Sequence, residues 1–442
     1  MNTLACSHDS YSIDHATVSV YAVHCDTGEV LISKNCNLSM TPASCVKIVT
    51  TAAALYLLGA NRRFETHLEY DGWIDHKQTL HGHLYIRGGG DPCLGSDCIP
   101  GNLSWKGQIE RWADAIQKLG IHRIKGKLIA DATKWEKALA VPSWAWEDLG
   151  NYYGAGASAL SFHENQYSIF FRPASKIGEK AHILRTDPPL TSLVLQNEVK
   201  TGPEGSGDHA WIYGSEFSST HFIRGTIPLG VDEFSIRGAI PDPAFFCGNL
   251  LTQELQKRGV IIKNENVEQQ DKRVSFHTTY SPTIREIVHW THQKSINLYA
   301  EHLLKKIGEV IYHEGSTISG IKAVTEFWHS QNIDMGGFNM MDGSGLSRKN
   351  LVTTKQLVQI LVKMRKSEFF SIFFDSLPQN ENFIRGKSGS LSLIKGYVGY
   401  LDKIAFAILV NQCPNHQIIN EKINAFLSNL NELNHNLKLE KP

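Results

Sequence analysis

The chain has 442 residues, of which 42% are hydrophobic and 20% are charged, an ordinary composition for a globular protein. Single hydrophobic cores stop growing at roughly 250–300 residues, so we expect two or three domains. Lys and Arg together number 44, as do Asp and Glu, and this balance argues against a nucleic acid or an anionic membrane as a partner bound through bulk charge.

The sequence shows neither a membrane segment nor an export signal. No stretch reaches the roughly 20 consecutive apolar residues that a bilayer-spanning helix needs. The longest candidate, residues 48–58, is short and contains two threonines. The first residues, MNTLACSHDS, lack the basic start and the apolar centre of a secretory signal. We therefore predict no transmembrane segment in this chain, while the residues alone leave its compartment open.

A β-hairpin and then a helix are predicted near the N-terminus. Residues 17–35 carry β-branched side chains on both sides of a turn at residues 26–28, which is typical of two paired strands. Thr41 is the expected N-cap of the helix, Pro42 lies in its first turn, and Gly59 is the expected C-cap. Because this helix is apolar nearly all round, we expect it to be buried.

Two polar residues stand at the head of this apolar helix. Lys47 follows Ser44 by three residues, so on a helix their Cβ atoms would lie about 5–6 Å apart on one face. Burial of an ammonium group disfavours its charged form, which turns a lysine into a general base. The spacing therefore suggests a serine nucleophile activated by a lysine. The pattern S-x-x-K is weak evidence alone, since it recurs at Ser392 and Lys395.

The middle of the chain has a different sequence pattern from both ends. Between about residues 68 and 270, short strand-like runs alternate with glycine and proline turns such as RGGGDP and TGPEGSGD. We interpret this region as inserted β-rich domains. The predicted organisation is a domain of residues 1–67 plus 274–442, an inserted domain of residues 68–160 plus 222–273, and a nested β-rich domain of residues 161–221.

Two further short motifs follow the inserted region. Ser295-x-Asn297 opens a helical run that bears alanine and leucine. Lys387-Ser388-Gly389 falls on a predicted strand, where it offers a cation, a hydroxyl group and a glycine that lets a ligand approach the backbone. Neither motif indicates a function when taken alone.

The C-terminal region is predicted to return to the first domain. Residues 388–412 read as consecutive strands with a turn at residues 401–403, and residues 418–430 as an amphipathic helix. Strands at both ends of the chain, with helical segments between them, predict an α+β core assembled from the two termini.

Taken in order, S-x-x-K, S-x-N and K-S-G match the signature of penicillin-recognising serine enzymes, each on the expected kind of element. The chain resembles the D-alanyl-D-alanine carboxypeptidase/endopeptidase family, the low-molecular-mass class C penicillin-binding proteins, over essentially its full length. The resemblance implies a transpeptidase core like that of serine β-lactamases, an antiparallel sheet flanked by helices, with inserted domains. Other family-like stretches are RGGGDPCL (87–94), DATKW (131–135), WAWEDLGNYYGAGASALSFHENQ (144–166) and DGSGLSRKNLVT (342–353).

The resemblance also implies an acyl-enzyme mechanism. Ser44 would attack the carbonyl between two D-alanines of a peptidoglycan stem peptide, and Lys47 would take its proton. Ser295 would relay this proton to the leaving amine, and Asn297 would hold Lys47 and the substrate amide. The backbone N–H groups of Ser44 and Ser390 would form the oxyanion hole. Expected activities are D-Ala-D-Ala carboxypeptidase and DD-endopeptidase, and β-lactams are expected to acylate the same serine.

Substrate contacts follow from the third motif and from one aspartate. Lys387 and the Ser388 hydroxyl would hold the terminal carboxylate, and Gly389 would let the peptide approach the strand. Asp131, the acidic residue of DATKW, is expected by resemblance to face the substrate side chain and contact the amino end of a diamino acid. An ordinary turn or cap aspartate is the alternative for Asp131.

Two other functions remain open from the sequence. A serine β-lactamase carries the same three motifs and differs mainly in fast deacylation. Residues 147–151, EDLGN, are similar to the glutamate loop of class A β-lactamases, but that loop follows the second motif there and precedes Ser295 here. A non-catalytic β-lactam or peptidoglycan sensor would be expected to have a membrane segment, and none is visible.

The chain contains twenty histidines, among them His81-x-His83 and His289-x-x-His292, which could suggest a metal site. No H-E-x-x-H motif and no paired C-x-x-C spacing occurs, so we expect no metal and no cofactor. The expected partners are peptidoglycan stem peptides and β-lactams. Because peptidoglycan lies outside the cytoplasmic membrane, the chemistry implies a periplasmic or other extracytoplasmic location.

Overall fold

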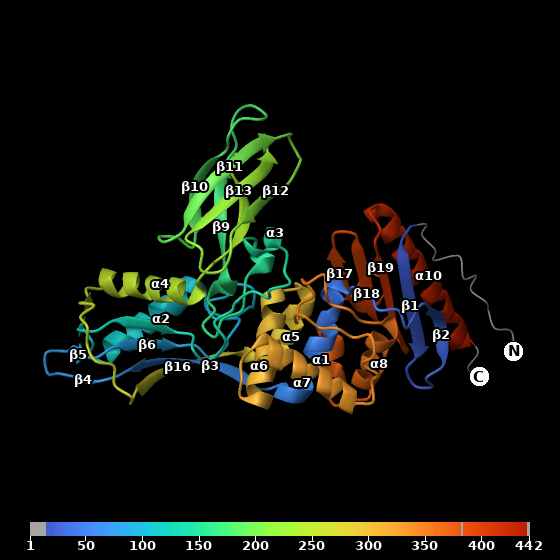
Figure 1. Ribbon diagram of the computed structural model, residues 1–442, viewed down its shortest axis with the longest axis horizontal. Coiled ribbons are helices and arrows are strands. Elements are labelled where there is room, and N and C mark those ends of the chain that lie inside the picture. The colour runs from blue at the N-terminus through green and yellow to red at the C-terminus, as the bar shows by residue number, and fades with distance from the viewer. Residues whose placement is uncertain (1–14, 382, 440–442) are drawn as a thin grey trace. The chain divides into compact units, whose positions relative to one another are not determined.

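The computed structural model of the protein describes residues 15–381 and 383–439 (Figure 1). The chain forms two compact units: the first combines the N-terminal part up to Arg62 with the part from Ile284 onward, and the second is Arg63–Thr283. These boundaries lie five and ten residues from the predicted ones at 67 and 274. The predicted division of the insertion into two domains stays a prediction. In the described part of the chain, no helix is both long and apolar enough to cross a membrane.

The first unit contains a five-stranded antiparallel sheet in the order β17-β18-β19-β1-β2. The predicted N-terminal hairpin is confirmed, and so are the consecutive C-terminal strands. The α+β core built from both chain ends is therefore confirmed as well. The strands are β1 (Thr17–His24), β2 (Val30–Lys34), β17 (Arg385–Leu391), β18 (Ile394–Leu401) and β19 (Ile404–Asn411).

Helices cover this sheet on both faces. Alternate residues of β19, among them Phe406 and Ile408, pack with the apolar side of the C-terminal helix α10, which includes Phe426. The helices α1 and α8 lie on the opposite side of the sheet from α10 (Figure 1). The helices of the unit are α1 (Lys47–Leu58), α5 (Ile284–Gln293), α6 (Asn297–Tyr312), α7 (Thr317–Ser330), α8 (Thr354–Arg365), α9 (Phe370–Ser376) and α10 (His416–Leu439).

The helix that carries the first motif starts differently from the prediction. A short 3₁₀ helix, Ala43–Val46, precedes α1, whose N-cap is Val46. Thr41 is therefore not the N-cap, and its hydroxyl instead donates to the Arg348 carbonyl oxygen at 3.3 Å. The predicted C-cap is confirmed, because the N–H of Gly59 donates to Leu55 O at 3.2 Å with φ +82°.

Helix α1 is enclosed by the unit as predicted. Ten of its twelve residues are buried, including three consecutive alanines. Small side chains let neighbouring helices approach closely, and the Trp328 ring N–H donates to Val49 O at 3.2 Å. A helix buried on all sides provides a rigid support for the side chains at its first turn.

The second unit contains four small sheets. Two have four strands, in the orders β16-β3-β6-β8 and β15-β7-β5-β4, and two have three, in the orders β10-β9-β14 and β11-β13-β12. The strands are β3 (Arg63–Tyr70), β4 (Trp73–Ile74), β5 (Thr79–His81), β6 (Leu84–Arg87), β7 (Arg123–Ile124), β8 (Leu128–Asp131), β9 (Gln166–Arg172), β10 (His182–Asp187), β11 (Val194–Gly202), β12 (His209–Tyr213), β13 (Thr220–Pro228), β14 (Phe234–Ala239), β15 (Ile261–Ile262) and β16 (Val274–Thr283). Its helices are α2 (Trp105–Lys118), α3 (Trp146–Leu149) and α4 (Pro243–Lys257).

Candidate active site

Ser44 and Lys47 meet at the start of α1. Ser44 lies in the 3₁₀ helix and is half-buried, while Lys47 is the first residue of α1 and is 0% exposed. The Lys47 Nζ atom lies 3.0 Å from Ser44 Oγ, which is hydrogen-bond distance. The change from an α-helical to a 3₁₀ start therefore does not separate the pair. This geometry suits proton transfer from the serine hydroxyl to the amine.

Two further groups hold the Lys47 amine. Its Nζ lies 2.7 Å from Oδ1 of Asn297, at the first residue of α6, and 2.6 Å from the backbone carbonyl oxygen of Ser344. Together with Ser44 these acceptors occupy three directions around one nitrogen. The structure thus brings Asn297 of the second motif to the first motif. A neutral amine has only two hydrogens, so one of the three neighbours would have to give a hydrogen to Nζ, and only the Ser44 hydroxyl can do so.

The electrostatic surroundings favour a neutral Lys47. Complete burial and the nearby Lys387 hold the pKa of Lys47 well below its usual range, while Asp342 and Glu301 oppose that shift in part. Removal of the charged form from water is the larger effect. A lysine whose pKa is lowered in this way is a better general base, because a larger fraction of the amine is neutral at a given pH.

Cys45 adjoins the nucleophile but faces another environment. Its Sγ atom lies 3.5 Å from the Lys387 carbonyl oxygen inside the protein. Burial raises the pKa of the Cys45 thiol to about 12. Since the thiolate is the reactive form, Cys45 acts as a packing residue.

The loop that supplies the Ser344 carbonyl is fixed by two buried carboxylates. Glu301 accepts hydrogen bonds from the N–H groups of Gly343 at 3.1 Å and Ser344 at 2.8 Å. Asp342 accepts from the N–H of Gly345 at 2.8 Å, so the loop folds around its own carboxylate. Burial and the neighbouring Asp342 raise the pKa of Glu301 to about 7.

Sequence reasoning recognised this loop only as a family-like stretch with glycines that support a tight turn. It missed that the loop contributes the Ser344 carbonyl to Lys47, and it missed Glu301. A signal for Glu301 was present, because it follows Asn297 by four residues and therefore shares its face of α6. A backbone carbonyl leaves no such signal, since every residue has one.

The third motif lies on β17 and borders a pocket of about 290 Å³. Lys387, which is 2% exposed, and Ser388 line this pocket. Ser295, which precedes α6 and is half-buried, lines it as well, so the second and third motifs meet there. Burial lowers the pKa of Lys387 to about 8. The pocket is also lined by His292, Gln293, Lys294, Pro378, Gln379, Asn380, Gly386 and Tyr397.

Gly389 marks the closest approach of β17 to the nucleophile. A Cβ atom on Gly389 would lie 2.6 Å from Pro42 O and 2.9 Å from the backbone nitrogens of Ser44 and Cys45. These distances are far shorter than ordinary van der Waals contacts, and the obstructing atoms belong to the backbone, so relief requires a shift of the main chain. Glycine is therefore required here to bring the strand against the Ser44 backbone.

We expect Gly389→Ala to push β17 away from Ser44. Overpacking of this kind costs about 1–3 kcal/mol, and the acylation rate should fall because the strand and the nucleophile no longer keep their spacing. Thermal unfolding and β-lactam labelling measure the two effects. Gly107→Ala in α2 is the matched control for stability, since a Cβ there makes only ordinary contacts at 3.6 Å or more. An alanine at 389 that changes neither quantity would contradict this close approach.

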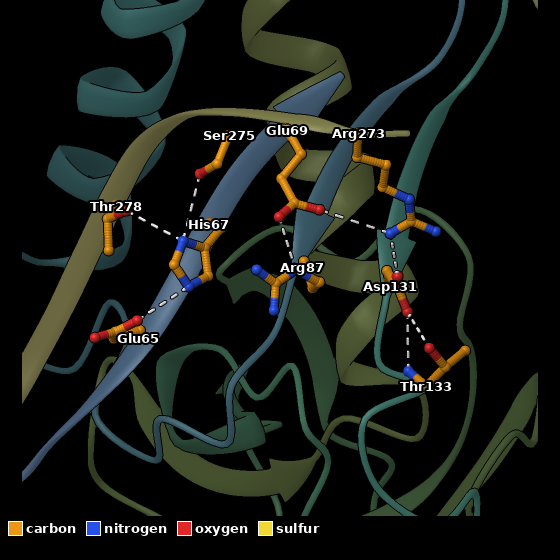
Figure 2. Close-up of polar contacts among 9 residues, drawn as sticks. All are labelled: Glu65, His67, Glu69, Arg87, Asp131, Thr133, Arg273, Ser275 and Thr278. Carbon is orange, nitrogen blue, oxygen red and sulfur yellow. Dashed lines mark hydrogen bonds and ion pairs between the residues drawn. The ribbon is translucent and has the colours of Figure 1, made fainter. Parts of the chain in front are cut away.

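Asp131 lies in the second unit, at the end of β8 (Figure 2). Its Oδ2 atom lies 2.6 Å from Nη1 of Arg273, and its Oδ1 accepts from the N–H and hydroxyl of Thr133 at 3.0 and 2.6 Å. Arg273 also faces Glu69, which pairs with Arg87 at 2.8 Å. Burial alone would raise the pKa of Asp131, but these hydrogen bonds together hold it below its usual value. Both oxygens therefore have partners within the second unit, and a substrate contact of Asp131 stays a prediction.

Known proteins resemble this chain over most of its length. The family model of the D-Ala-D-Ala carboxypeptidase 3 (S13) family matches residues 4–430. A D-alanyl-D-alanine carboxypeptidase of Actinomadura sp. (strain R39) is 27% identical over 90% of this chain and 78% of the relative. The carboxypeptidase DacB of Haemophilus influenzae is 23% identical over 85% of this chain and 76% of the relative.

The fold has a counterpart among solved structures. The crystal structure of penicillin-binding protein 4 (dacB) from Haemophilus influenzae matches with a TM-score of 0.77 at 20% identity, over 93% of each chain. The same protein has been solved in complex with a β-lactam, and that structure matches with a TM-score of 0.77 over 96% of this chain and 98% of the other. The likeness confirms the predicted penicillin-binding fold.

Proposed function

The chain belongs to the D-Ala-D-Ala carboxypeptidase 3 (S13) family, and from this premise we propose that it is a serine D-alanyl-D-alanine carboxypeptidase that cleaves peptidoglycan stem peptides through an acyl-enzyme on Ser44. The observation that carries the proposal is the buried Lys47 amine 3.0 Å from the Ser44 hydroxyl. The amine is held in place by Asn297 and by the Ser344 carbonyl. This is the arrangement that base-activated nucleophilic catalysis needs.

Acylation starts with the neutral Lys47. It takes the proton of the Ser44 hydroxyl as Oγ attacks the carbonyl carbon between the two D-alanines. The backbone N–H groups of Ser44 and Ser390 stabilise the oxyanion, a role supported by the close approach of Gly389 to the Ser44 nitrogen. Ser295 passes the proton to the leaving amine, the C–N bond breaks, and D-alanine departs. Water then attacks the ester by the reverse route, which frees Ser44.

The terminal carboxylate binds beside the third motif. A Lys387 ammonium and the Ser388 hydroxyl provide one charged and one neutral donor at the pocket wall. This local charge explains how a chain of zero net charge binds an anionic peptide end. Asp131 contacts the amino end of the diamino acid in this proposal, and the substrate displaces Arg273 or Thr133 to reach it. Because the substrate lies outside the cytoplasmic membrane, we place the enzyme there too.

The protein's working pH range should depend on Lys387. Its pKa is lowered to about 8, so the ammonium is lost as pH rises through that value. We expect the preference for a D-Ala-D-Ala peptide over its C-terminal amide, measured as a ratio of kcat/KM, to fall about tenfold between pH 7 and pH 9. Lys387→Arg keeps the charge throughout and should flatten this dependence. A preference that stays constant in the wild type would refute carboxylate binding by Lys387.

Incubation with purified stem pentapeptides and cross-linked dimers tests the function as a whole. Release of free D-alanine is the expected result, and separation of cross-links would add DD-endopeptidase action. A preparation that releases neither product refutes the proposal. The lifetime of the β-lactam adduct separates the alternatives: hours are expected for a penicillin-binding protein, whereas seconds or less would indicate a β-lactamase.

A further inference from the structure

A buried histidine lies beside the site but outside its three motifs. His292, in the last turn of α5, is 1% exposed. Its Nε2 atom is 2.8 Å from the Thr51 hydroxyl on α1, and its Nδ1 atom is 2.7 Å from the Ser376 hydroxyl on α9. One imidazole ring thus joins three helices of the first unit. His292 belongs to the pair His289-x-x-His292, and its hydrogen bond to Thr51 connects it to α1, the helix that carries Lys47.

The connection continues to the base itself. The Thr51 hydroxyl lies 2.6 Å from the Lys47 carbonyl oxygen, one helical turn back. On the other side, the Ser376 hydroxyl lies 2.6 Å from the carbonyl oxygen of Phe373, whose ring meets the imidazole edge-on at a centroid distance of 5.5 Å. The ring plane is therefore fixed from two directions, and it reaches the Lys47 backbone through one hydroxyl.

The charge state of the ring follows from its neighbours. Burial holds the pKa of His292 well below its usual range, and three groups add to this shift: Lys387 on β17, Lys47 on α1 and His289 on α5. A neutral imidazole has one N–H, so it and the two hydroxyls supply three hydrogens for four close contacts. One hydroxyl must therefore donate to the ring instead of to its carbonyl. Only a few distributions of these hydrogens are therefore possible, and each of them uses the hydroxyls of both Thr51 and Ser376.

We propose that His292 is a positioning residue for Lys47, which it holds by tying Thr51, and hence the first turn of α1, to the end of α5 and to α9. Ser295 follows His292 by three residues, so the same ring also sets where the second motif begins relative to the first. For its kinetic consequence the inference rests on the proposed function.

Two amide substitutions separate the two sides of the ring. Glutamine places its amide near the position of Nε2 and keeps the contact with Thr51, whereas asparagine places it near Nδ1 and keeps only the contact with Ser376. We expect His292→Asn to lower the second-order rate of β-lactam acylation about tenfold and His292→Gln to stay within about threefold of the wild type. A purely structural role would lower stability in both variants without this rescue by glutamine.

Thr51→Val breaks the contact between His292 and Thr51 from the other side, since it removes only the hydroxyl and nearly preserves the side-chain volume. It should slow acylation as much as His292→Asn does. The matched control is His221→Gln, which alters a buried histidine of the second unit and should leave the rate unchanged. Equal rates in His292→Asn, Thr51→Val and the wild type would overturn the inference, as would equal losses in His292→Asn and His292→Gln.

The pH profile and an activity-free readout complete the test. The decrease of the acylation rate at low pH should keep its midpoint in His292→Gln, because Lys47 and not His292 is the titrating base. Loss of this pH dependence would overturn the assignment.

NMR of lysines labelled with ¹³C at Cε reports on Lys47 directly. The Lys47 signal is the one that is missing from the spectrum of Lys47→Ala. Its signal should move in His292→Asn but not in His292→Gln, even if no β-lactam reacts. An unreactive wild type would refute the proposed function, whereas unchanged Lys47 signals would refute the positioning role.

Discussion

Ser44→Ala should abolish acylation by β-lactams and the release of D-alanine. The hydroxyl of Ser44 is the nucleophile 3.0 Å from the Lys47 amine, and alanine removes the attacking atom without adding volume. Removal of a nucleophile typically leaves only residual catalysis, so we expect a loss of at least about 10³-fold in kcat. Intact-mass spectrometry after incubation with a β-lactam should show one adduct on the wild type and none on the variant.

The chain provides its own control for this experiment. Ser392, which also stands three residues before a lysine, lies between β17 and β18 and outside the site. Ser392→Ala should therefore label as the wild type does. A Ser44→Ala protein that still carries an adduct would assign the nucleophile elsewhere.

Lys47→Ala should slow acylation by about a hundredfold or more, the range expected for loss of a general base. The fold should persist, because a small residue at this position avoids the burial of an amine. Stopped-flow or time-resolved mass measurements of the acylation rate test this, with Lys395→Ala as the control. A reduction of less than about fivefold would mean that another group takes the serine proton.

The lowered pKa of Lys47 also has a consequence for stability. The unfolded chain takes up a proton on this amine below about pH 10.4, while the folded protein takes it up only at a lower pH. Between these two values the unfolded state binds more protons, so this group makes the folded protein more stable as pH rises. Denaturant unfolding should show a steeper rise of the free energy of unfolding with pH in the wild type than in Lys47→Ala.

Many of the strands and helices could be predicted from local patterns of hydrophobic residues in the sequence. The hairpin at residues 17–35, the strands after residue 388 and the helix near residue 418 were all predicted, because alternation and amphipathic periodicity are properties of short windows. The start of α1 was mispredicted. Thr41 has the chemistry of an N-cap, but its hydroxyl bonds to Arg348, which is far away in the sequence.

At the active site, too, the sequence alone predicted some residues, while others were found only in the folded structure. Three motifs in order identified the family and pointed to Ser44, Lys47, Asn297 and Lys387, because reactive side chains are encoded directly as residue types. The Ser344 carbonyl, the carboxylate of Glu301 and the ring of His292 acquire their roles only from packing. Their contacts join segments that are between 43 and 297 residues apart in the sequence. Burial in the folded unit, which no short stretch of sequence records, lowers the pKa of the lysine base.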